Sequence, residues 1–159
     1  MKAKAMRQVK KYMQNFKYIY KKELLKIDLW HFTFQMDAGL PEIQMTIKFD
    51  EGFLDVLAFP HPIIVNENNF YNLLRTINNI NWNLKSLGRL YIDDYNDLAY
   101  SLRIKYNFLE KTGEILLEEI EFAIDIYSDL LKIIFDVSQD KISYEAAKNE
   151  IDLIWRKRY

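Results

Sequence analysis

The sequence predicts an α+β fold: a helix, three strands, a helix, two strands and two helices, with a mainly antiparallel five-stranded sheet and the helices on one of its faces. Three observations predict it. Apolar and polar residues alternate in five segments, these segments come in runs joined by short turn-forming stretches, and apolar residues recur every three or four positions at both ends of the chain. Strands joined by tight turns pair antiparallel, which gives the sheet its expected type.

The first helix is expected within a basic segment, residues 1–22. This segment holds eight of the 22 Lys and Arg residues and none of the 23 Asp and Glu residues. Such a helix either docks on an acidic surface of its own chain or of a dimer partner, or binds nucleic acid or an anionic membrane. Docking is favoured, because one face of the helix is apolar and needs cover. The apolar face consists of Met6, Val9, Met13, Phe16 and Tyr20.

Three amphipathic strands are expected next, because apolar and polar residues alternate with a period of two. Flexible and turn-forming residues separate them at 38–41 and 50–52. Pro60 and Pro62 are expected to end the third strand, since proline cannot donate a hydrogen bond to a neighbouring strand. The three strand segments are residues 30–36, 43–49 and 53–59.

A second helix is expected to begin at Asn66, a residue type that caps helix N-termini well. The Asn-rich stretch 78–83 that follows this helix is expected to form turns. Two more strands are expected, one around residues 90–92 and a strongly alternating one over 98–107. The acidic segment 93–97 supplies the turn between them.

A long amphipathic helix is expected over residues 116–137, followed by an additional helix over residues 143–157. The long helix carries more apolar residues than contact with one sheet requires. Either it is wedged between two layers of its own chain, or a second subunit covers the surplus. The residues of this candidate partner or dimer surface are Leu117, Ile124, Leu131 and Phe135.

The composition indicates one cytoplasmic domain over residues 1–159. Half of the residues are hydrophobic and 15% are aromatic, so the chain can bury a core that offsets its ordering entropy. The sequence has no cysteine, which excludes disulfides and cysteine-based metal sites. Neither a signal peptide nor a transmembrane segment is expected, because charged residues interrupt the apolar stretches.

Residues able to support catalysis are few, so neither an enzyme nor a cofactor or metal is expected. His31 and His61, the two histidines, fall on a polar strand face and in a loop between prolines, without metal-ligand spacing. The four glycines stand apart and form no phosphate-binding loop. The acidic segment 93–97 lacks the glycine and closing glutamate of a calcium loop, which favours a simple turn.

The polar face of the sheet is a candidate binding surface. If helices cover only the apolar face, the polar face and the strand edges stay open to an extended partner segment. A solvated face without a partner is the other interpretation. The sequence leaves open which strands are neighbours. The candidate residues on this face are Gln44, Thr46, Lys48, Arg103 and Lys105.

Three segments carry a resemblance to a known family, namely IQMTIKFDEGFLDVLAFP, NNFYNLLRTINNINWNLKSLG and GRLYIDDYNDLAYSLRIKY. In pattern and order they resemble the YbjN family of proposed bacterial sensory transduction regulators, whose fold is similar to that of type III secretion chaperones. The resemblance covers roughly residues 10–144 and includes no catalytic motif. It implies a small, dimeric bacterial cytoplasmic protein that holds or regulates another protein. The extra final helix and the strongly basic first helix depart from the family.

These observations support three functional hypotheses. The first is a non-enzymatic, dimeric protein-binding or chaperone-like regulatory module with an unidentified protein partner or client. The second is association with nucleic acid or an anionic membrane through the basic helix in residues 1–22. The third, an enzyme of unrecognised type, is the least favoured, because the sequence contains no convergent catalytic set.

Overall fold

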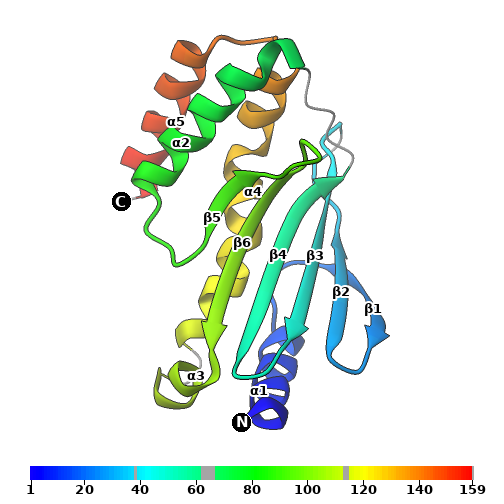
Figure 1. Ribbon diagram of the computed structural model, residues 1–159. Helices are drawn as coiled ribbons and strands as arrows, with labels where there is room; N and C mark the ends of the chain where they lie inside the picture. Colours follow the sequence, from blue (N-terminus) through cyan, green and yellow to red (C-terminus); the bar gives the residue numbers. More distant parts are fainter. Residues whose placement is uncertain (38, 62–66, 113–114, 159) are drawn as a thin grey trace.

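The computed structural model describes residues 1–37, 39–61, 67–112 and 115–158, and it confirms the α+β class. One sheet in the order β1-β2-β3-β4-β6-β5 contains six strands, and every neighbouring pair is antiparallel (Figure 1). The strands are β1 (Tyr20–Lys26), β2 (Leu29–Phe34), β3 (Glu42–Phe49), β4 (Phe53–His61), β5 (Arg89–Ile92) and β6 (Leu98–Lys105).

The helices lie on one face of the sheet and beyond both of its ends, with α3 at the lower end in Figure 1. Helices α1 and α4 lie behind the sheet in Figure 1, and α4 continues upward to pack with α2 and α5. The helices are α1 (Lys2–Gln14), α2 (Phe70–Asn83), α3 (Tyr106–Thr112), α4 (Glu118–Ser138) and α5 (Tyr144–Arg158), with short 3₁₀ turns at Glu67–Asn69 and Ile115–Leu117. None of the helices in the described part of the chain combines the length and apolar character of a membrane span.

The sheet has one strand more than the five expected, because β1 does not show the alternation of apolar and polar residues by which the other strands were predicted. Six of its seven residues are exposed, so its sequence carries no apolar period of two. As an edge strand it pairs only with β2, from Tyr20 opposite Phe34 to Lys26 opposite Leu29. The basic segment 1–22 is therefore a helix only as far as Gln14, and its last residues enter the sheet.

Several other boundaries differ from the expected ones. Helix α2 continues through the Asn-rich stretch, because Asn81 does not form a turn but bonds both Leu90 N–H and Leu90 C=O, at 2.9 and 2.8 Å. Strand β4 continues through Pro60 to His61, where its pairing with β6 has already ended. Strand β6 stops at Lys105, and a short helix, α3, follows at once. Helix α5 extends one residue past the expected end. Asn66, the expected helix cap, lies outside the described residues.

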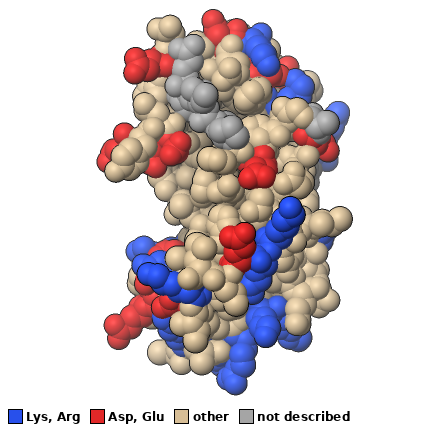
Figure 2. Space-filling model, turned by 90° about the vertical axis from the view of Figure 1, so that its right-hand side faces the viewer, with Lys and Arg blue, Asp and Glu red and all other residues tan. Residues whose placement is uncertain are grey.

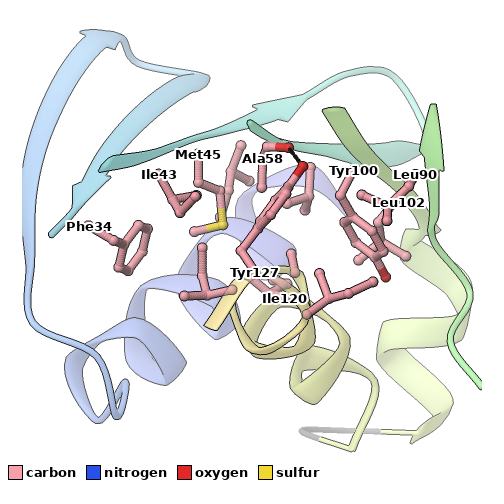
Figure 3. Packing of buried hydrophobic residues seen from close by; sticks show 14 of the residues in the cluster. Phe34, Ile43, Met45, Ala58, Leu90, Tyr100, Leu102, Ile120 and Tyr127 are labelled. Carbon is pink, nitrogen blue, oxygen red and sulfur yellow. Dashed lines mark hydrogen bonds between the residues drawn. The ribbon is translucent and has the colours of Figure 1, made fainter. Parts of the chain in front are cut away.

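The core lies between the sheet and α4, as the alternation predicts. In β3, for example, Ile43, Met45 and Ile47 are buried whereas their polar neighbours point outward. Tyr127 of α4 is fully buried among these strands, and its hydroxyl donates to the Ala58 carbonyl of β4 at 2.9 Å (Figure 3). Helix and sheet are thus joined by a hydrogen bond inside the apolar layer, where an unpaired carbonyl is costly.

Alkaline pH is expected to destabilise the fold. Burial raises the pKa of Tyr127 well above 10.0 and that of Tyr100 to about 12. Unfolded tyrosines ionise near 10.0, so above that pH the folded chain binds more protons than the unfolded chain, and the free energy of unfolding falls as pH rises. Below pH 10.0 the contribution is fully present. Denaturant unfolding between neutral and alkaline pH measures this fall, and Tyr100→Phe should make it shallower. A free energy of unfolding independent of pH there contradicts the expectation.

The surplus apolar surface of α4 is covered by its own chain. Leu117, Ile124 and Leu131 are fully buried. Helix α4 contacts the sheet and the helices α2 and α5, and the 3₁₀ turn that contains Leu117 contacts α3. The prediction that these three residues form a partner or dimer surface is therefore wrong, and they give no support to a dimer. Phe135 is partly buried, with Lys141 Nζ 5.1 Å from its ring centroid.

The basic helix α1 docks on its own chain, which is the first of the two interpretations of the N-terminal charge. Its residues Val9 and Met13 are buried in the core. Lys17, just after the helix, pairs with Asp125 at 2.7 Å and with Glu121 at 3.1 Å, both on α4. The acidic side of α4 thus neutralises part of the basic segment.

Candidate binding site at the edge of strand β6

Strand β6 has one edge that is only half paired. Strand β5 lies opposite residues 98–101 of β6 and extends no further, whereas β4 accompanies β6 on its other side as far as Lys105. Backbone groups of successive residues in a strand point to opposite neighbours. The Tyr106 N–H donates to Gly52 on the β4 side, so Arg103 and Lys105 direct their N–H groups to the side that β5 leaves open.

We call this open side of Arg103 and Lys105 the β6 edge. Among the described residues, no backbone hydrogen bond is found to the N–H of Arg103 or Lys105, or to the Arg103 carbonyl. An unpaired edge of this kind is a template for another extended chain.

A hollow of about 500 Å³ lies along the β6 edge. Its walls are mostly apolar, and two of the apolar side chains are strongly exposed, Leu87 by 62% and Phe108 by 52%. Exposed apolar residues gathered at one concave place are typical of a site that a partner covers. The hollow is lined by Leu87, Arg103, Ile104, Lys105, Phe108, Thr112 and Leu116.

Helix α3 forms one wall of the hollow, and its start is anchored to the turn between β3 and β4 by two hydrogen bonds. Tyr106 donates from its backbone N–H to Gly52 C=O at 3.0 Å and from its hydroxyl to Asp50 C=O at 2.7 Å. Leu109, one turn later, is fully buried. Burial of Leu109 leaves Phe108 on the exposed side of this short helix, facing the hollow.

The segment between α2 and β5 forms the opposite wall and is held by a hydrogen-bond network. Ser86 Oγ lies 2.5 Å from both Tyr100 Oη and a Glu119 carboxylate oxygen. The same carboxylate accepts the Leu87 N–H at 3.0 Å. Gly88 packs so closely on Tyr100 that a Cβ there would lie 2.3 Å from the ring. The network fixes the backbone that presents Leu87.

The two cations beside the hollow differ in how well they are neutralised. Arg103 binds the Asp55 carboxylate at 2.7 and 3.3 Å and lies 4.3 Å from the Phe53 ring centroid. The hydrogen bond with Asp55 raises the pKa of Arg103. Lys105 is exposed and has no ion pair within the described chain. Lys105 is therefore the charge at this edge that remains available to an acidic partner.

The structure brings the five sheet-face residues onto one polar face, across three strands. Strand β4 separates Gln44, Thr46 and Lys48 of β3 from Arg103 and Lys105 of β6. In register, Lys48 and Arg103 flank Asp55, and Lys48 also pairs with Asp50 at 2.7 Å. Most of the positive charge expected on this face is thus balanced by carboxylates within the chain.

The remaining candidate groups show no convergence. His31 lies on the polar side of β2, as expected, whereas His61 is the last residue of β4 rather than part of a loop. In the turn after β5, Asp93 Oδ1 accepts the N–H groups of Tyr95 and Asp97, both at 2.9 Å, which is a backbone role. The described ranges contain no group of three His, Asp or Glu side chains placed to hold a metal ion.

The sequence pointed to Arg103 and Lys105 but not to the hollow beside them. Leu87 falls in a stretch that was expected to be irregular, and Phe108 follows a strand that was expected to run further. The sequence does carry a signal for helix α3, because Tyr106 and Leu109 are both apolar and three positions apart, which places them on one helical face. The short length of β5, which opens the edge, has no comparable signal.

Comparison with known proteins finds similarity among solved structures and none elsewhere. No protein-family model matches the chain, and no curated protein matches it. Among solved structures, the chain is similar to the crystal structure of YbjN, a proposed transcription regulator from E. coli, with 13% sequence identity and a TM-score of 0.44, covering 79% of this chain and 90% of that chain. This similarity assigns no function to this chain.

Proposed function

We propose that this protein is a non-enzymatic binding module that receives an extended segment of a partner protein along the β6 edge. The observation that carries the proposal is the coincidence of three features at one place: unpaired backbone groups, an apolar hollow and an unneutralised lysine. A segment that adds a strand to a sheet uses its own main chain for affinity and its alternate side chains for specificity.

The backbone contribution comes from the N–H groups of Arg103 and Lys105 and the Arg103 carbonyl. A partner strand placed where β5 would continue pairs with all three groups. Each such hydrogen bond contributes about 0.5–1.5 kcal/mol net to the free energy of binding. Main-chain pairing alone is therefore weak, and side-chain contacts must supply the rest.

The side-chain contribution sets the chemistry of the partner segment. Ile104 faces the helices and lines the hollow, so the partner residue opposite it points into an apolar space with Phe108. The partner residue opposite Lys105 points to the polar face, where a carboxylate is favoured. Since neighbours on a strand face opposite sides, the partner is expected to carry an acidic residue directly beside a large apolar one.

Selection from a library of random peptides displayed against the immobilised protein tests this function. We expect enriched peptides to contain an acidic residue next to a large apolar residue, and Phe108→Ser to weaken their binding about tenfold by removing an apolar contact. Trp82→Ser is the matched control, because Trp82 is an exposed aromatic residue of α2 that does not line the hollow. A lack of enrichment, or equal effects of the two substitutions, contradicts the proposal.

A further inference from the structure

The hairpin formed by β1 and β2 exposes a patch of aliphatic side chains at its tip. Leu24 is exposed by 67%, Leu25 by 56% and Ile27 by 85%. Leu24 and Leu25 are both exposed because the register of β1 shifts between Leu24 and Lys26. We call these three side chains the hairpin tip. It belongs to the edge of the sheet opposite to that of β5.

Lysines surround the hairpin tip. Lys22 lies on the same side of β1 as Leu24, with its Nζ 4.1 Å from the Trp30 ring centroid. Desolvation of its ammonium group and the nearby charge of Lys10, on α1, both lower the pKa of Lys22, although the residue as a whole is exposed. Lys26 is the last residue of β1. In the described chain Lys10, Lys22 and Lys26 have no ion pair, so positive charge accumulates here uncompensated.

The two acids in this hairpin do not neutralise the lysines. Glu23 lies opposite His31 and therefore on the other side of β1 from Lys22. Asp28, in the turn, is already paired with Lys2 of α1 at 3.0 Å. Figure 2, which faces this side of the molecule, shows Lys and Arg side chains over its lower part, with uncharged side chains between them and Asp and Glu side chains beside some of them.

From this juxtaposition of exposed aliphatic side chains and uncompensated lysines, we propose that the hairpin tip docks on an anionic lipid surface. Leu24, Leu25 and Ile27 enter the interface between headgroups and acyl chains. Lys10, Lys22 and Lys26 bind lipid phosphates and carboxylates. This surface differs from the one proposed in the first helix, because most of it lies in β1.

Two other occupants fit this surface less well. A nucleic acid contacts lysines through its phosphates but gains nothing from three exposed aliphatic side chains. A second copy of the chain, paired through β1, brings together two strands that each carry Lys21, Lys22 and Lys26, and the like charges of the two strands repel. A lipid surface both binds the lysines through its anionic headgroups and covers the exposed aliphatic side chains.

Sedimentation with vesicles tests the proposal on the intact chain. We expect binding to vesicles of phosphatidylcholine with phosphatidylserine, much weaker binding to phosphatidylcholine alone, and a decrease as salt increases. The double substitution Leu25→Ser with Ile27→Ser should lower the partition coefficient at least tenfold, and so should Lys22→Glu with Lys26→Glu. The matched controls are Leu153→Ser and Lys157→Glu, which change an exposed leucine and an exposed lysine of α5 and should leave binding unchanged.

Several results overturn the proposal. Vesicle binding that is absent, equal on both vesicle types or insensitive to the tip substitutions removes the lipid surface as the occupant. A dimer that dissociates on the Leu25→Ser and Ile27→Ser substitution, without vesicle binding, identifies a second copy instead. Binding of a single-stranded oligonucleotide that survives this substitution, again without vesicle binding, identifies nucleic acid. All these side chains are exposed, so circular dichroism should show an unchanged fold in each variant.

Discussion

Replacing Lys105 with proline is expected to weaken the binding of an enriched peptide about 100-fold without unfolding the protein. The substitution removes the Lys105 N–H that points to the open side of β6, and its ring obstructs an incoming strand. Within the described part of the chain this N–H has no backbone partner, and Lys105 directly precedes helix α3, where the fixed φ of proline is tolerated. Titration of a labelled peptide by fluorescence anisotropy measures the change.

Lys105→Ala is the matched control for the proline variant. It removes the same charge but keeps the N–H, so it should weaken binding by only about tenfold or less. The difference between the two variants isolates the backbone contribution. If the proline and alanine variants weaken binding by the same factor, the partner uses the lysine side chain and not the strand edge, and the proposed mode of binding is wrong.

Gly88→Ala is expected to lower the free energy of unfolding by about 1–3 kcal/mol, the usual range for an overpacked site. The added Cβ would lie 2.3 Å from the end of the Tyr100 ring. Tyr100 cannot move aside cheaply, because it is fully buried and its hydroxyl is 2.5 Å from Ser86 Oγ. Denaturant unfolding monitored by circular dichroism measures the loss.

A double-mutant cycle separates this clash from other effects of alanine. In a Tyr100→Leu background the end of the ring is absent, so the added Cβ should cost much less than in the native background. An equal cost in both backgrounds contradicts the steric explanation. The Gly88→Ala variant should also bind the enriched peptide less well, since the segment that contains Gly88 positions Leu87 at the hollow.

The strands that bury one face were predictable, and the exposed edge strand was not. β3 and β6 alternate because each residue that faces the helices is apolar. β1 buries almost nothing, and its pairing with β2 is made by backbone groups that every sequence possesses. Periodicity reports burial and not pairing, so a strand of this kind leaves no trace in the sequence.

The surplus apolar residues of α4 show a second limit of prediction from sequence periodicity. Leu117, Ile124 and Leu131 were correctly recognised as needing cover, but periodicity does not distinguish cover by the same chain from cover by another. The three-dimensional arrangement provides the cover within the chain. Helices α2 and α5 pack on the end of α4 that extends past the sheet, and α3 contacts the 3₁₀ turn that contains Leu117 at the other end (Figure 1).

The candidate site was predictable only in part, for a related reason. Arg103 and Lys105 follow from the alternation of β6, whereas the opening beside them depends on where β5 ends. The end of β5 is set by tertiary contacts, since Asn81 holds Leu90 and Gly88 packs on Tyr100. Contacts between segments distant in sequence decide which backbone groups stay unpaired.

Amide hydrogen exchange followed by NMR tests the central claim most directly. In the free protein the amides of Arg103 and Lys105 should exchange much faster than those of Leu102 and Ile104, which point to β4. Addition of an enriched peptide should slow the exchange of Arg103 and Lys105 at least tenfold. A bound peptide that leaves both amides exchanging as in the free protein would contradict binding of an extended segment at the β6 edge.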